Sequence, residues 1–160
     1  MKIRNASMED LAAIGEVEKR CFPPAEAATK EDFAKRLSVY PNHFWLLEDD
    51  GKLVAFVNGM VTNEDTLRDE MYERAELHKE KGDWQMIFGV NTIPEYRRQG
   101  CAEKVLKKVI EDAKDEGRKG LVLTCKEALV HYYEKFGFRN EGVSESTHGG
   151  AVWYDMRLKF

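Results

Sequence analysis

The chain has 160 residues, a net charge of −4, 42% hydrophobic residues and 34% charged residues, which is ordinary for one globular domain. We therefore expect a single domain over residues 1–160 and, given the acidic balance, no nucleic-acid partner. No apolar run approaches the ~20 residues of a membrane span, and the N-terminus lacks the apolar core of a signal peptide, so no membrane partner is expected. Three widely spaced cysteines favour reduced thiols and a cytoplasmic location.

The four histidines, at positions 43, 78, 131 and 148, show no metal-ligand spacing, and Cys-x-x-Cys is absent. We therefore expect no metal site. The oligomeric state is left open between monomer and homodimer.

The first half of the chain predicts a strand, two helices and a hairpin. A short strand over 2–6 precedes a helix that Ser7 caps, with apolar residues at 11, 14, 17 and 21 on one face. Two prolines at 23 and 24 end that helix. Thr29 caps a second helix, and residues 44–57 predict a hairpin that turns at Asp49–Lys52. The charged stretch 64–82 predicts a further helix that ends near Gly82.

The second half alternates strands and helices. A buried strand over 84–92 leads through a basic turn into an amphipathic helix that runs from near Gly100 to about Glu116. A strand over 121–124 follows, then a short helix over 128–136 and the final strands, which include 151–156. The order predicts an α/β (α+β) domain, a mixed central sheet of about seven strands with helices on both faces.

The turn before the long helix, Arg97-Arg98-Gln99-Gly100-Cys101-Ala102, is the most informative motif. A tight turn at a helix N-terminus presents several backbone N–H groups, where the helix dipole also favours negative charge. Gly100 permits close approach of a ligand to the backbone, and the arginines supply guanidinium donors. The motif indicates a phosphate or pyrophosphate site, although an ordinary helix start with solvated charges remains the alternative.

This turn resembles the (Arg/Gln)-x-x-Gly-x-(Gly/Ala) loop of the GNAT superfamily of N-acyltransferases, whose amides hold the coenzyme A pyrophosphate. A second motif, residues 123–138 ending in Tyr-Glu-Lys-Phe-Gly-Phe, resembles the family's strand-then-helix segment. Within the superfamily the chain is most similar to the arylalkylamine (serotonin) N-acetyltransferase group, over nearly its whole length. The resemblance implies the GNAT fold, with a splayed strand pair at the acetyl-CoA site.

The resemblance also implies a reaction: acetyl transfer from acetyl-CoA to a primary amine of a small molecule, by direct attack in a ternary complex. The coenzyme-binding residues expected by motif position are Val90, Asn91, Thr92, Arg97, Arg98, Gln99, Gly100, Cys101, Ala102, Glu103, Thr124 and Tyr133. Tyr133 matches the family tyrosine that protonates the coenzyme sulfur, although a tyrosine in an amphipathic helix is also an ordinary packing residue.

The base is where the chain departs from the serotonin enzymes, which carry two histidines on the strand before the loop. Met86 and Phe88 stand at those positions and cannot accept a proton, so they are expected to form an apolar wall for the acceptor. Glu26 is the predicted replacement, since a glutamate just after the first helix is the base in the similar insect dopamine N-acetyltransferases. A solvated loop carboxylate is the competing interpretation. The predicted acceptor-binding residues are Phe22, Pro23, Glu26, Met86, Phe88 and His148.

Two alternatives to a small-molecule enzyme stay open. One is acetylation of protein or peptide amines, which needs an open groove. The other is a domain that binds acyl-CoA as a sensor without catalysis, against which the presence of both Tyr133 and Glu26 argues.

Overall fold

The computed structural model describes residues 1–160. It contains four α-helices: α1 (Leu11–Cys21), α2 (Lys30–Val39), α3 (Cys101–Asp115) and α4 (Val130–Glu134). The strands are β1 (Lys2–Asn5), β2 (Phe44–Asp49), β3 (Lys52–Asn58), β4 (Val61–Thr62), β5 (Trp84–Ile87), β6 (Gly89–Thr92), β7 (Gly120–Cys125), β8 (Arg139–Val143) and β9 (Tyr154–Lys159). None of the helices has the length and apolarity needed to cross a bilayer.

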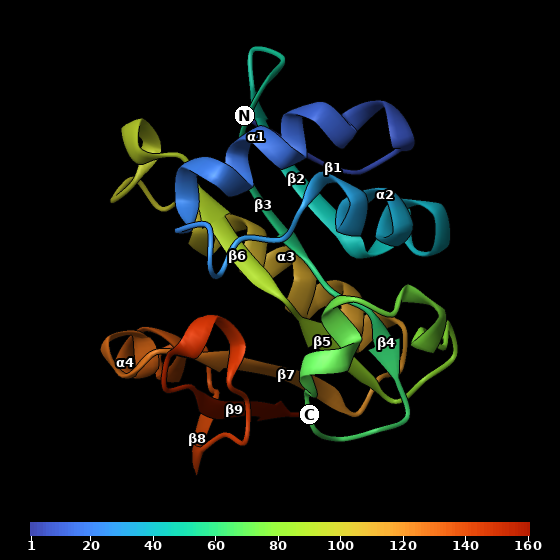
Figure 1. Ribbon diagram of the computed structural model, residues 1–160, viewed down its shortest axis with the longest axis vertical. Coiled ribbons are helices and arrows are strands. Elements are labelled where there is room, and N and C mark those ends of the chain that lie inside the picture. Colours follow the sequence, from blue (N-terminus) through green and yellow to red (C-terminus); the bar gives the residue numbers. More distant parts are fainter.

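The strands form two sheets, in the orders β1-β2-β3-β6 and β4-β5-β7-β9-β8. Only β5 and β7 pair in parallel; the other pairs are antiparallel. Figure 1 shows α1 crossing in front of β3 and β6 while α3 lies behind them, so the first sheet is covered on both faces. The second sheet, with α4 beside it, forms the other half of the molecule.

The elements of the first half begin where the sequence predicts. Asp10 accepts a hydrogen bond from the Ser7 N–H group before α1, and Thr29 and Asp32 form a reciprocal capping box on α2. The hairpin turns through Asp50 and Gly51, both with positive φ (48° and 79°), as a tight turn between twisted strands requires. These predictions are confirmed.

The predicted strand over 84–92 is broken into β5 and β6, which belong to different sheets. The partner run is broken too: the chain bends between β3 and β4 at Gly59, where an added Cβ would lie 1.8 Å from the Met86 carbonyl oxygen. The backbones cross this closely only because Gly59 has no side chain. Two broken runs explain why the structure contains nine strands where about seven were expected.

The helix predicted within 64–82 is wrong. That segment contains only two 3₁₀ turns, Asp69–Tyr72 and Ala75–Leu77. The Tyr72 carbonyl, which a helix would have used internally, accepts a hydrogen bond from the Arg36 guanidinium at 2.9 Å. Leu67, Met71 and Ala75 are buried in a small core cluster around Trp84 and Met86. Tertiary contacts therefore override the local preference.

The end of the chain needs smaller corrections. The helix expected over 128–136 is a 3₁₀ turn (Glu127–Leu129) followed by α4. The last strand begins at Tyr154 rather than Ala151, because His148–Gly150 forms a turn in which both glycines have positive φ. This turn contains His148, which lines the cavity described below.

Candidate active site

The two sheets separate between β6 and β7. β6 pairs with β3 alone and is the edge strand of its sheet, whereas β7 pairs with β5 and β9. A cavity of about 850 Å³ opens here, with Gly89 and Val90 on one side and Leu123, Thr124 and Cys125 on the other. The break at Phe88 separates β6 from β7, because β5 on one side of the break pairs with β7, whereas β6 on the other side pairs with β3.

The basic loop after β6 ends in α3, with Arg98 and Gly100 both at positive φ (62° and 77°). The six consecutive N–H groups from Arg98 to Glu103 donate to no acceptor within the protein. Arg97 is tied back to the strand by a hydrogen bond from its Nε to the Thr92 carbonyl at 3.0 Å. Free amides at the positive end of a fifteen-residue helix form a cradle that suits a pyrophosphate.

Tyr133 lies on α4 and lines the cavity, with 6% of its surface exposed. Its ring packs edge-on against Tyr132 and Phe138, at centroid distances of 5.2 and 6.0 Å. Burial raises the pKa of Tyr133 well above its ordinary value, so the hydroxyl keeps its proton at neutral pH. The side chain thus lines the cavity and carries a proton at neutral pH.

Four stacked or tilted rings form an aromatic wall in the same cavity. Tyr72 lies between Phe88 (4.7 Å between ring centroids) and His148 (5.0 Å, nearly parallel), and Trp153 follows at 6.0 Å from His148. Burial raises the pKa of Tyr72 to about 12, although the Thr124 side chain opposes part of that rise by hydrogen bonding. Such a wall suits an aromatic or other apolar group of a ligand.

Glu26 lies in the loop between α1 and α2 and its side chain is 10% exposed. Its carboxylate is paired with Lys126, whose Nζ lies 2.9 Å from Oε2. Its carbonyl accepts a hydrogen bond from His148 Nε2 at 2.7 Å, and Gly149 packs so closely that a Cβ there would meet the Glu26 Cγ at 2.6 Å. The turn before β9 therefore fixes the Glu26 loop against the cavity.

Eight of the predicted site residues line this cavity, and the others lie outside its lining. The lining includes Phe22, Pro23, Glu26, Phe88, Val90, Thr124, Tyr133 and His148. Asn91 is a buried residue of β6, and residues 97–103 form the end of the following loop and the start of α3. Met86 is different: it is fully buried in the small core cluster and does not line the cavity, because neighbouring residues of a strand face opposite sides of the sheet and it is Ile87 that faces the cavity.

Among the cavity residues that were not anticipated from the sequence, two are buried charges. Glu18 and Arg36, 6% and 2% exposed, both line the cavity. A signal existed, since Glu18 follows Ile14 by four positions and Arg36 follows Phe33 by three, which puts each charge on the apolar face of its helix. A charge on a buried face usually has a structural or functional partner.

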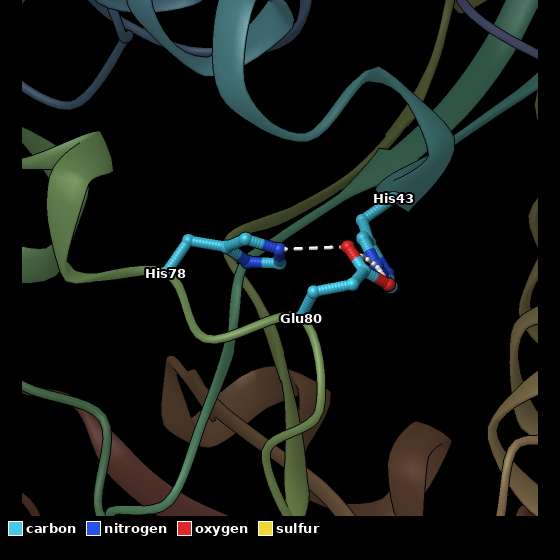
Figure 2. Close-up of side chains that lie close together, drawn as sticks. All are labelled: His43, His78 and Glu80. Atoms are coloured by element: carbon cyan, nitrogen blue, oxygen red, sulfur yellow. Dashed lines mark hydrogen bonds and ion pairs between the residues drawn. The ribbon is translucent and has the colours of Figure 1, made fainter.

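A second cluster, which does not line this cavity, joins His43, His78 and Glu80 (Figure 2). His43 Nε2 and His78 Nε2 each lie 2.9 Å from a Glu80 carboxylate oxygen. The spacing of histidines along the chain did not reveal this group, because the contact is made in three dimensions.

The hydrogen bonds around this cluster define what it can do. The Val61 N–H group donates to His78 Nδ1 at 3.0 Å, so His78 Nε2 carries the hydrogen that faces Glu80. Arg118 adds positive charge 3.6 Å from the same carboxylate. A metal at His78 Nε2 would need the lone pair that this tautomer lacks, so the arrangement fits an ion-pair cluster better than a metal centre.

Comparison with known proteins decides the family. The sequence profile described as Acetyltransferase (GNAT) family matches residues 11–138. The chain belongs to the GNAT family. It is 23% identical to serotonin N-acetyltransferase of Mesocricetus auratus over 160 residues, which cover 98% of this chain and 76% of that protein. Like its family, this GNAT protein is an acyl-CoA-dependent acetyltransferase.

Solved GNAT structures share the fold over the whole chain. The GphF GNAT-like decarboxylase in complex with isobutyryl-CoA superposes with a TM-score of 0.85 at 20% identity, covering 99% of both chains. The ribosomal-protein-S18-alanine N-acetyltransferase of Escherichia coli superposes at 0.74 and 21% identity, covering 99% of this chain and 92% of that one. These neighbours act on different substrates, so the acceptor must be argued from the cavity.

Proposed function

We propose that this GNAT protein transfers the acetyl group of acetyl-CoA to the primary amine of a small molecule, by direct attack in a ternary complex. The observation that carries the proposal is one continuous cavity between β6 and β7 that contains both Tyr133 and the aromatic wall, while the loop with free amides follows along the chain from the same strand, β6. The coenzyme would lie between the parted strands, with its pyrophosphate on the N–H groups of residues 98–103.

The residues have separate roles in this proposal. Backbone groups of β6 around Val90 hold the pantetheine arm and polarise the thioester carbonyl. Tyr133 gives its proton to the departing sulfur. Burial raises the pKa of Tyr133, so this proton is present at neutral pH. The acceptor occupies the end lined by Phe22, Phe88 and His148.

The charge of the cavity favours a cationic acceptor. Its lining contains six carboxylates, Glu18, Glu26, Asp32, Asp69, Glu70 and Glu73, against the two permanent cations Arg36 and Lys126. Together with the aromatic wall, this composition suits an arylalkylamine, in which an ammonium is joined to a ring. The similarity to serotonin N-acetyltransferase points the same way.

The test is release of coenzyme A thiol from acetyl-CoA in the presence of an amine panel. Arylalkylamines, diamines, amino sugars and a pool of peptides would be compared at equal concentration. We expect 2-phenylethylamine-like compounds to support turnover and peptides to support little. Turnover with peptides alone would instead assign protein amines as acceptors, and coenzyme binding without any turnover would leave a sensor domain.

A further inference from the structure

Glu18 is a buried carboxylate without a counter-ion. It lies near the C-terminal end of α1, and its two oxygens accept hydrogen bonds from the Ala28 N–H group (2.8 Å) and from Asn91 Nδ2 (2.7 Å). Neither donor carries a charge, and Glu18 takes part in no ion pair. Burial raises the pKa of Glu18, while its two hydrogen bonds and the positive charges of Arg36 and His148 oppose the rise. A buried carboxylate in this condition attracts a cation.

The other acids of the cavity are already engaged or open to solvent. Glu26 is paired with Lys126, and Glu70 with Arg68 and Arg74. Asp32 caps α2, Asp69 accepts hydrogen bonds from Ser146 and Thr147, and Glu73 is exposed. Glu18 is thus the buried acid of the cavity that lacks a cationic partner, and each of its oxygens keeps a free lone pair.

The position of Glu18 relates it to the reaction. Asn91 joins it to β6, directly beside Val90, at the edge where the thioester is proposed to lie. Tyr133 lines the same cavity from α4, beside the second sheet, whereas α1 packs on the first sheet (Figure 1). An acceptor nitrogen between these walls would have a carboxylate on the β6 side and a hydroxyl on the α4 side.

We propose that the Glu18 carboxylate binds the ammonium group of the acceptor and takes its proton. The inference rests on the proposed function. In the step, an N–H bond of the ammonium breaks, its electron pair stays on nitrogen, and the proton moves to a Glu18 oxygen. The neutral amine then attacks the thioester carbon. As the adduct collapses, the sulfur leaves with the proton of Tyr133, the nitrogen returns a proton to that tyrosine, and Glu18 releases its own proton to water.

The structure favours Glu18 over Glu26 for this role because the two carboxylates differ in their partners. The Glu26 carboxylate already holds a cation, because the Lys126 Nζ lies 2.9 Å from its Oε2, so an acceptor ammonium would have to displace that partner. Glu18 has only neutral donors in contact, so its carboxylate has no cation to displace before it binds the ammonium. Glu26 then serves to hold the cavity wall.

The experiment compares the pH profiles of kcat/KM for the wild type, Glu18→Gln and Glu26→Gln, with 2-phenylethylamine as the probe. Glutamine is isosteric, and Asn91 can rotate its amide to keep a hydrogen bond, since its Oδ1 has no partner. We expect Glu18→Gln to lower kcat/KM roughly 10²-fold or more at pH 7 and to move its rise to the alkaline range where the free amine itself forms. Glu16→Gln, an exposed acid on the same helix, is the matched control and should behave as the wild type.

A structural role is separated by two further measurements. Coenzyme A binding, measured by calorimetry, should be unchanged in Glu18→Gln. Glu18→Asp keeps a carboxylate but does not fill the site better than glutamine, so it should recover part of the lost rate and part of the activity at low pH. A profile that is normal in Glu18→Gln and displaced in Glu26→Gln would overturn the inference while leaving the proposed function in place. A wild type that acetylates no amine would remove both.

Discussion

Tyr132 and Tyr133 are adjacent in α4, yet only Tyr133 reaches the cavity. Successive residues of a helix point about 100° apart, so one tyrosine faces the opening while its neighbour packs against Phe136. The same rule places Glu18 and Arg36 on the buried faces of α1 and α2. At the scale of the residue, function therefore depends on which face of an element a side chain occupies.

Removing the Tyr133 hydroxyl tests its role. We expect Tyr133→Phe to lower kcat roughly 10²-fold, the lower end of general acid effects, because a thiolate is already a moderate leaving group. Tyr132→Phe should retain wild-type turnover and serves as the control. Steady-state kinetics of both variants from pH 6 to 10 would measure the loss of kcat. Full turnover of Tyr133→Phe at every pH would exclude Tyr133 from the mechanism.

The His43–His78–Glu80 cluster makes stability depend on pH (Figure 2). Burial opposes ionisation of Glu80, yet hydrogen bonds from His43 and His78 lower its pKa to about 2. A carboxyl whose folded pKa lies below its unfolded value of about 4.3 stabilises the fold above that value, and the contribution is lost as pH falls toward 2. Burial lowers the pKa of His78 as well, which adds a loss that begins below about pH 6.5.

Replacing Glu80 should therefore weaken the fold mainly at neutral pH. We expect Glu80→Gln to be less stable than the wild type at pH 7, and the difference to shrink as pH falls below about 4.5. Urea unfolding at several pH values measures it, with the exposed Glu76→Gln as control. A constant difference at all pH values, or a large rise in melting temperature on adding Zn²⁺, would contradict the ion-pair interpretation.

Elements, rather than single residues, create the opening. The break between β5 and β6 places the two halves of one segment in different sheets. The bend at Gly59 does the same for β3 and β4, which pair with β6 and β5. Because β7 pairs with β5 but not with β6, the parted strands are left with a cavity between them. The site thus depends on a defect in strand pairing that local propensity does not encode.

A side chain at Gly59 should disturb this crossing. We expect Gly59→Ala to destabilise the protein by about 1–3 kcal/mol, since its Cβ would collide with the Met86 backbone, which must shift. Gly15→Ala in α1 is the matched control, because a Cβ there meets no atom within 4 Å and should raise stability by about 0.5–1 kcal/mol. Chemical denaturation of both variants checks the opposite signs.

At the scale of the whole molecule, the coenzyme would lie between the two sheets and join them. Binding to the folded state alone at a hundred times Kd stabilises it by about 2.7 kcal/mol, which in a domain of this size raises Tm by about 5–10 °C. We expect that shift with coenzyme A and its loss in Gly100→Val, where a β-branched residue would have to adopt positive φ and cover the loop amides. Thermal unfolding with and without the ligand measures it.

The sequence by itself determined the features that rest on local chemistry. The capped helices, the Asp50-Gly51 hairpin, the amide-rich loop at Gly100 and the helix with Tyr133 follow from residue types at short spacing, and the structure contains all of them. Nearby residues meet whatever the rest of the chain does, so such patterns can be interpreted without a fold.

Only the tertiary structure decided which distant residues meet. It paired Glu26 with Lys126, a hundred positions away, left Glu18 without a cation, removed Met86 from the cavity and gathered His43, His78 and Glu80. It also replaced the helix expected over 64–82 with two short turns held by Arg36 and the core. These outcomes depend on contacts between residues far apart in the chain, which packing of the two sheets selects and local pattern does not.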